Sequence, residues 1–293
     1  MVTEKVVLVT GATDGVGKLV AQRFAGEGAR VLLHGRNAAK GAAVLDEIKQ
    51  NTGSEKLEFF CADLSSLAEV RKLADEIKGK HERIDLLINN AGIGASHGAT
   101  LASSGPVERT EVDHPVPEAL EVSKDGHELR LAVNHLSAFL LTNLLKQQLA
   151  KSDRPRVVAV SSIGQSPIDF DDLMLTSGQD EMHAYRQSKF AQVMFTFELA
   201  DRFKDIGVTA VAVHPASFMS TKMVIEGGLT PKTTPEEGAE AIYKVATDPS
   251  IKGQSELFFN TTEPARAKDD QAYDPAARDR FWDISAKLTG LAA

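Results

Sequence analysis

Tyr185 and Lys189 are the two residues whose types and spacing could do chemistry. They lie four positions apart in a helical context, so one turn of helix places both side chains on the same face. A tyrosine has an ordinary pKa of about 10, and a nearby cation favours the phenolate and lowers that pKa. The pair is therefore suited to proton transfer at a substrate oxygen. Because many surface helices carry a Tyr and a Lys at this spacing by chance, a solvated pair is the alternative.

The composition narrows the classes of function. With 293 residues, 42% of them hydrophobic, the chain is long enough to bury a sizeable core. The net charge of -8, with no run of Lys or Arg, argues against a nucleic-acid or anionic-membrane partner. A single cysteine, Cys61, excludes an intrachain disulfide and a cysteine-rich metal site, and we expect it to be a small buried hydrophobe. No metal site is predicted.

The N-terminal residues lack the pattern of a signal peptide, and no apolar run approaches the roughly 20 residues that span a bilayer. We therefore expect a cytoplasmic protein with no membrane span.

Seven short apolar stretches alternate with helical patterns along the chain. Alternation of this kind predicts an α/β fold with one doubly wound sheet of seven parallel strands and helices on both faces. No repeat or linker interrupts it, so residues 1–293 are expected to form a single domain. The predicted strands are residues 6–10, 29–34, 57–62, 84–88, 156–160, 208–213 and 256–259.

A glycine-rich turn follows the first predicted strand and precedes a helix over residues 18–27. Its glycines, Gly11, Gly15 and Gly17, would let the backbone approach a pyrophosphate, which sits well at the positive N-terminus of a helix. The spacing is G-x-x-x-G-x-G and departs from the G-x-G-x-x-G fingerprint. The turn predicts a dinucleotide site of the Rossmann type, and a glycine turn without a ligand is the alternative.

The second predicted strand ends in Gly35, Arg36 and Asn37. In dinucleotide folds an acidic residue at this place binds the ribose 2′-hydroxyl, whereas an arginine accommodates a 2′-phosphate. Arg36 is present and no Asp or Glu is. This favours NADP(H) over NAD(H), and a solvent-facing loop arginine is the alternative.

Polar and small residues also follow the third, fourth and fifth predicted strands. They are Asp63, the run Asn89-Asn90-Ala91-Gly92, and the pair Ser161 and Ser162. Ligands of parallel α/β sheets bind outside the carboxyl ends of the strands, so these residues are expected near the cofactor or substrate. A turn or cap role is the alternative for Asp63.

Three segments are expected to build the substrate pocket, residues 93–126, 164–183 and 217–233. Residues 93–126 form a connection long enough to be a functional or mobile loop, and residues 217–233 are expected to form a lid over the site. Residues 127–150 are expected to form one long amphipathic helix, in which Asn134 is a buried polar group that needs partners. The helix predicted over about residues 182–203 is apolar on nearly all sides. We expect it to pack on the sheet and on a partner subunit, which favours a homodimer or homotetramer.

Taken together, these motifs resemble those of the classical short-chain dehydrogenase/reductase family over about residues 4–260. Thr10, Gly11, Gly15 and Gly17 match its TGxxxGxG motif, Asn89 to Gly92 match NNAG, and Asn134, Ser162, Tyr185 and Lys189 fall where the family has its catalytic tetrad. The sequence over residues 134–145 and 185–189 looks like the retinol dehydrogenase and protochlorophyllide reductase-like branch, which commonly uses NADP. Ala216 replaces the glycine usual after His-Pro, and the connection over residues 93–126 is longer than usual, so the substrate class does not carry over.

The resemblance implies a role for each matched residue. Tyr185 would be the general acid/base, Ser162 would bind the same substrate oxygen with Ser161 as its competitor, and Lys189 would lower the tyrosine pKa and hold the nicotinamide ribose. Asn134 would anchor a water that relays protons. Asp63 would contact the adenine, Asn90 would lie beside the adenosine ribose, and Thr221 would reach the nicotinamide carboxamide. The full predicted cofactor-binding set is Gly11, Thr13, Asp14, Gly15, Val16, Gly17, Arg36, Asn37, Asp63, Leu64, Asn90, Ala91, Gly92, Tyr185, Lys189, Pro215 and Thr221.

The function predicted on these grounds is an NADP(H)-dependent oxidoreductase that moves hydride between nicotinamide and a small carbonyl or alcohol substrate. Phe218 and Met219 suggest that this substrate is apolar, although both are equally compatible with a core position. A catalytically idle NADP(H) sensor and an epimerase or dehydratase on the same fold are the alternatives.

Overall fold

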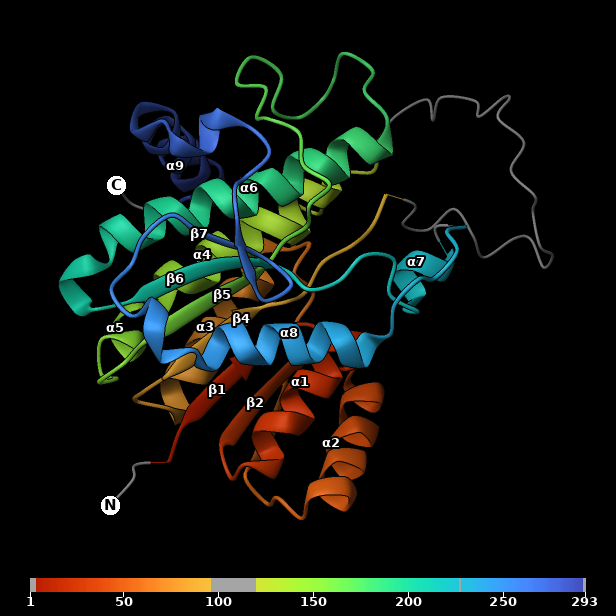
Figure 1. Ribbon diagram of the computed structural model, residues 1–293, viewed down its shortest axis with the longest axis vertical. Helices are drawn as coiled ribbons and strands as arrows, with labels where there is room; N and C mark the ends of the chain where they lie inside the picture. Colours follow the sequence, from red (N-terminus) through yellow and green to blue (C-terminus); the bar gives the residue numbers. More distant parts are fainter. Residues whose placement is uncertain (1–3, 96–119, 227, 292–293) are drawn as a thin grey trace.

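A twisted sheet of eight strands forms the centre of the molecule (Figure 1). The computed structural model describes residues 4–95, 120–226 and 228–291. The strand order is β3-β2-β1-β4-β5-β6-β7-β8, and all neighbouring pairs are parallel except β7 and β8. The strands are β1 (Val6–Val9), β2 (Arg30–Gly35), β3 (Leu57–Cys61), β4 (Leu86–Asn89), β5 (Arg156–Val160), β6 (Thr209–His214), β7 (Leu257–Asn260) and β8 (Glu263–Ala265).

The predicted doubly wound α/β fold is confirmed, with one correction to the strand count. The seven predicted strands are present and parallel, and the short strand β8 adds an antiparallel return at the edge. β8 has only three residues, of which one is Pro264, so it carries too little alternation to be predicted from its sequence.

Helices cover both faces of the sheet (Figure 1). One face is covered by α1 (Gly15–Gly26), α2 (Ala38–Thr52) and α8 (Pro235–Thr247). The other face is covered by α3 (Leu67–Lys80), α4 (Ser137–Leu144) and α6 (Glu181–Arg202), with α9 (Pro275–Thr289) packed outside α6. Because the strand order reverses between β1 and β4, the carboxyl ends of these two strands form the switch point where ligands of such sheets bind.

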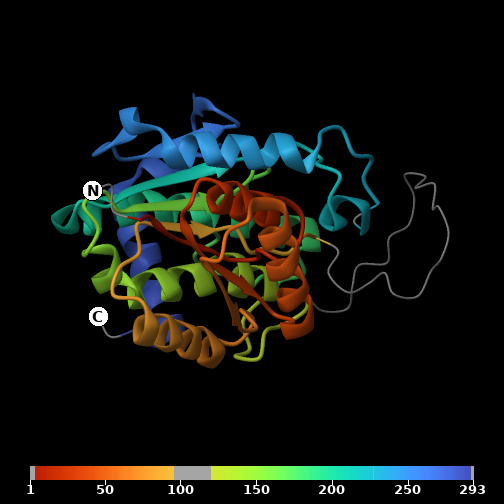
Figure 2. The ribbon, with the colours of Figure 1, turned by 90° about the horizontal axis from the view of Figure 1, so that it is seen from below.

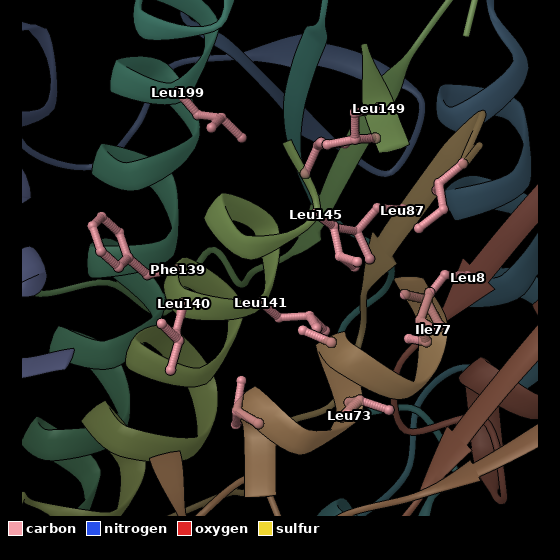
Figure 3. Close-up of a cluster of buried hydrophobic side chains, with 14 of the residues drawn as sticks. Leu8, Leu73, Ile77, Leu87, Phe139, Leu140, Leu141, Leu145, Leu149 and Leu199 are labelled. Atoms are coloured by element: carbon pink, nitrogen blue, oxygen red, sulfur yellow. The ribbon is translucent and has the colours of Figure 1, made fainter. Parts of the chain in front are cut away.

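The core under α3 and α4 is built from aliphatic side chains that fix these helices on the sheet. Figure 3 shows Leu8 and Leu87 from the strands facing Leu73 of α3 and Leu141 of α4, all buried. Burial of one such side chain stabilises the fold by roughly 1.5 to 3 kcal/mol. The continuous apolar strands seen in the sequence are therefore those buried on both faces.

The segment over residues 127–150 is not the single helix that was predicted. A π-helical turn over Leu131–Leu136 comes first, α4 follows, and a separate short helix, α5 (Lys146–Leu149), ends the segment. The apolar pattern runs through all three pieces, so periodicity alone does not reveal where the hydrogen-bond ladder changes.

Helix α6 is covered within its own chain. Phe195 of α6 stacks on Trp282 of α9 at 5.9 Å between ring centroids, and Phe197 packs against Tyr273 at 5.4 Å. The second apolar side of α6 therefore gives no evidence for a partner subunit, and the homo-oligomer remains a prediction. The prediction for Cys61 is wrong, because this side chain is exposed at the end of β3.

None of the described helices is both long and apolar enough to cross a membrane.

Candidate active site

The predicted site residues gather at the carboxyl edge of the parallel strands. The glycine loop follows β1, Arg36 follows β2, Asp63 follows β3, the NNAG run spans the end of β4, and Ser162 follows β5. Figures 1 and 2 both place the short helix α7 (Lys222–Glu226), which follows β6, beyond the end of α8 at this edge.

The glycine loop and the end of β4 lie in close contact. A Cβ on Gly17 would lie 2.3 Å from Asn90 Nδ2 and 2.4 Å from Gly11 O, so only glycine fits there. The Asn90 amide donates to the backbone oxygens of Thr10 and Gly11 at 2.9 and 3.2 Å. A Cβ on Gly11 would meet Ala91 Cα at 2.8 Å. Asn90 therefore ties the two loops together, and its predicted place beside the ribose stays a prediction.

His34 also holds the glycine loop, and the sequence analysis missed it. Its Nδ1 accepts a hydrogen bond from the Gly11 N–H at 3.3 Å, and its Nε2 lies 3.1 Å from Ala62 O. Burial lowers the pKa of His34 to about 4, so the ring is neutral at neutral pH. A titratable side chain at the end of a buried strand is the signal that could have identified it.

The first turn of α1 offers the cradle that a dinucleotide needs. The Asp14 carboxylate accepts from the Gly15 N–H at 2.9 Å and caps the helix. A Cβ on Gly15 would lie 3.5 Å from the Thr221 methyl group, so the loop after β6 faces the glycine loop across this N-terminus. These residues fit a nicotinamide dinucleotide, since glycine leaves room for the phosphates and the helix end favours their charge.

The other residues of the predicted set near these loops are mostly packing residues. Thr13 packs on Gly35, and a Cβ added to Gly35 would lie 2.5 Å from the Thr13 methyl group. Val16 and Leu64 are buried in the core. Pro215 lies next to Gly238 of α8, because a Cβ added to Gly238 would lie 3.5 Å from Pro215 Cβ.

The region after β2 carries two exposed cations. Arg36 is exposed and makes no ion pair with the part of the chain that the structure describes. Lys40 pairs with Asp14, so the one carboxylate of the glycine loop is neutralised. Asn37 caps α2 by accepting from the Lys40 N–H at 2.9 Å.

Asp63 is bound by groups of the chain. Its carboxylate accepts from the Ser65 N–H and hydroxyl at 3.0 and 2.8 Å and pairs with Lys124 at 3.1 Å. Although partial burial raises its pKa, these bonds outweigh that effect and hold the pKa of Asp63 below its ordinary value. Asp63 therefore has the turn role that was the alternative prediction, and its contact with an adenine remains a prediction.

Asn134 connects three elements of the site. Its Oδ1 accepts from the Ile93 N–H at 2.8 Å, and its Nδ2 donates to Ile93 O at 3.1 Å and to the Ser188 hydroxyl at 2.8 Å. A Cβ on Gly92 would lie 3.1 Å from Asn134 Oδ1 and 3.3 Å from Lys189 Nζ. The predicted buried Asn134 with partners is confirmed, and its side chain binds the end of β4 to helix α6.

Tyr185 and Ser162 lie within hydrogen-bonding reach of each other, and their predicted contact with a substrate oxygen stays a prediction. Burial raises the pKa of Tyr185, and a hydrogen bond with Ser162 partly opposes this effect. Ser161, the competing serine, is buried and donates its hydroxyl to the backbone oxygen of Lys189 at 2.7 Å. The geometry therefore favours Ser162 for the catalytic role.

Lys189 is one helical turn from Tyr185, as predicted, but its ammonium turns toward the interior. Its Nζ lies 5.7 Å from the centroid of the Tyr185 ring and donates to Val160 O at 3.0 Å. Burial lowers the pKa of Lys189 to about 8. The predicted lowering of the tyrosine pKa by this ammonium is not found, because burial raises the pKa of Tyr185 and the opposing effect comes from Ser162.

The predicted substrate side of the site, formed by the segment after β6, is more exposed and apolar. Phe218 is 40% exposed and has a positive φ of 52°, whereas Met219 packs against the core of the sheet. Met223 and Ile225 of α7 and Leu229 are also exposed. Within the predicted segment 93–126, residues 96–119 lie outside the described residues. The exposed apolar side chains named above belong to the predicted lid over residues 217–233, whose closure over the site stays a prediction.

The sequence matches a known protein family over most of its length. The model of the family described as short chain dehydrogenase matches residues 5–230. The chain belongs to the short-chain dehydrogenase family. Membership accounts for the fold and the glycine loop, and the family binds a nicotinamide cofactor and acts on alcohol or carbonyl groups.

Individual relatives place the chain in the retinol dehydrogenase-like branch of the short-chain dehydrogenases. It is 34% identical to dehydrogenase/reductase SDR family member 13 of Bos taurus over 97% of this chain and 73% of the relative. It is 33% identical to human retinol dehydrogenase 11 over 98% of this chain and 86% of the relative. A short-chain dehydrogenase of Escherichia coli solved with NADPH superposes with a TM-score of 0.66 at 25% identity, over 89% of this chain and 98% of that one.

Proposed function

We propose that the protein is an NADP(H)-dependent oxidoreductase that reduces apolar aldehydes, ketones or quinones. The observation that carries the proposal is the convergence of the Tyr185 and Ser162 hydroxyls beside the buried Lys189 ammonium, at the edge of the sheet that holds the glycine loop. This arrangement can bind a carbonyl oxygen through two hydroxyl donors and then deliver a proton to it.

The chain's own residues account for the proton step. Burial keeps Tyr185 protonated near neutral pH, which suits it to donate its proton to the oxygen of a reduced carbonyl. Ser162 orients the same oxygen, and Lys189 supplies positive charge close to the phenolate that remains. The glycine loop and Thr221 would hold the cofactor, which when bound supplies the hydride for the carbonyl carbon.

The preference for NADP(H) is supported by charge. Arg36 is an exposed cation after β2, and Lys40 neutralises Asp14, so a 2′-phosphate would meet positive charge there. A relative with 25% identity was solved with NADPH. The exposed apolar residues Phe218 and Met223 support an apolar substrate.

The test is a coupled set of assays on wild type and Tyr185→Phe. Loss of NADPH or NADH absorbance is followed with a panel of aldehydes, ketones and quinones, and cofactor affinity is measured by fluorescence. We expect faster turnover with NADPH and a loss of about 10²- to 10⁴-fold in Tyr185→Phe with unchanged NADPH affinity. Tyr243→Phe, a change of the same kind on α8, is the control and should keep full activity.

Two outcomes would overturn the proposal. NADPH binding without turnover across the panel would favour a sensor, and conversion of a substrate with no net change in cofactor redox state would favour an epimerase or dehydratase.

A further inference from the structure

Gln192 lies one helical turn after Lys189, on α6, and is 1% exposed. Its side chain uses both ends of the amide. Lys189 Nζ donates to Gln192 Oε1 at 3.1 Å, and Gln192 Nε2 donates to the backbone oxygen of Asn134 at 2.8 Å. One side chain therefore bridges two residues of the catalytic tetrad.

The π-helical turn makes this bridge possible. Asn134 lies within the turn over Leu131–Leu136, where the hydrogen-bond ladder is wider than in an α-helix. A side-chain donor can then approach a backbone oxygen from outside the helix. The family resemblance implies that a water lies between Lys189 and Asn134. In this protein the Gln192 side chain spans that position.

Within the described residues, the Lys189 ammonium donates to two acceptors, Val160 O and Gln192 Oε1, and both are neutral dipoles. The titratable groups that face it in this part of the chain are Tyr185 on the same helix and His214 at the end of β6. Burial and the nearby ammonium lower the pKa of His214 to about 4, so it adds no charge at neutral pH. Gln192 therefore supplies one of two contacts that stabilise the charged lysine.

We infer that Gln192 is a positioning residue, which fixes the Lys189 ammonium next to Asn134 and favours its charged form. This inference rests on the proposed function for its catalytic meaning, but the contact itself is measurable without turnover. A purely structural glutamine would affect folding and leave the titration of Lys189 unchanged.

The experiment titrates Lys189 directly in three variants. Protein labelled with [ε-13C]lysine is followed by NMR, and the Lys189 signal is assigned by its loss in Lys189→Arg. Gln192→Met keeps the length of the side chain and removes the acceptor, so we expect the pKa of Lys189 to fall by about half a unit to one unit. Gln192→Glu adds a negative charge and should raise it. Thr196→Val, which removes a buried hydroxyl one turn further along α6, should leave it unchanged.

Steady-state kinetics gives the second readout. In carbonyl reduction, the alkaline limb of kcat/KM should move to lower pH in Gln192→Met and to higher pH in Gln192→Glu, while the Kd of NADPH changes less than threefold. Equal lysine titrations in wild type and in whichever Gln192 variants fold would overturn the inference. Absence of turnover in wild type would refute only the proposed function. Thermal unfolding shows whether each variant is folded. If only one Gln192 variant folds, the direction of its Lys189 pKa shift still tests the inference, because a fall is expected for Gln192→Met and a rise for Gln192→Glu.

Discussion

On the proposed nucleotide side of the site, around the glycine loop, the backbone is held by polar groups of the chain itself. On the proposed substrate side, after β6, apolar side chains are left exposed. Asn90 and His34 bind the glycine loop through three hydrogen bonds. Phe218, Met223 and Ile225 are between 39% and 57% exposed. A cofactor common to many enzymes suits a fixed site, and a substrate particular to one enzyme suits a surface that closes only when it binds.

A buried arginine on the proposed substrate side holds the described ends of the connection over residues 93–126. Arg130 is fully buried and pairs with Glu128, Glu181 and Glu121, and it donates to the backbone oxygen of Ala95. It thereby joins the two described ends of residues 93–126 to the first turn of α6. Removal of Arg130 and crowding of Gly17 should affect different properties of the protein. The first should lower the free energy of unfolding, and the second should weaken cofactor binding.

The largest expected effect is that of Arg130→Met. Glu128 is 2% exposed and would remain as a buried charge without its partner, so we expect the free energy of unfolding to fall by about 3 to 5 kcal/mol. Urea denaturation measures this. Arg266→Met breaks an exposed pair with Asp270 and should change stability by less than about 1 kcal/mol. Equal effects of the two variants would show that the buried network does not anchor the connection.

Next in size is Gly17→Ala on the nucleotide side. The added methyl group would overlap Gly11 O, a backbone atom that cannot move without displacing the loop. We expect the Kd of NADPH to rise at least about 100-fold, which corresponds to about 2.7 kcal/mol. Gly79→Ala, in open space within α3, is the control and should stabilise the helix by up to about 1 kcal/mol. Unchanged cofactor affinity in Gly17→Ala would contradict a preformed loop.

A smaller effect is expected for Arg36→Ala. Loss of this cation should weaken NADPH binding about tenfold, or about 1.4 kcal/mol, and leave NADH binding within about twofold. Arg154→Ala, an exposed arginine before β5, is the control. A parallel loss of both affinities would mean that Arg36 does not distinguish the 2′-phosphate.

The smallest effect is expected for Phe218→Ala. Loss of an exposed aromatic contact should raise KM for apolar aldehydes about three- to tenfold, up to about 1.4 kcal/mol. The Kd of NADPH and the KM for a small polar aldehyde should stay the same, because neither ligand uses this surface. A change in NADPH affinity would instead place Phe218 on the nucleotide side.

Several features of this protein were determined by local sequence. Buried parallel strands are continuous apolar runs, and the glycine loop requires glycines where the chain turns and where Gly17 meets another backbone. The spacing of Tyr185 and Lys189 likewise follows from the pitch of one helix. The fold class, the glycine loop and the arrangement of this pair could therefore be predicted, because each depends on residues close together in the chain.

Other features were decided only by tertiary structure. The direction of the Lys189 ammonium depends on Gln192 and on Asn134, which lies 58 positions before Gln192 in the chain. His34 meets the glycine loop only because β2 pairs with β1, and α9 covers α6 from the far end of the chain. Burial, hydrogen-bond partners and pKa values are properties of packed neighbours, so the chain had to fold before its chemistry was set.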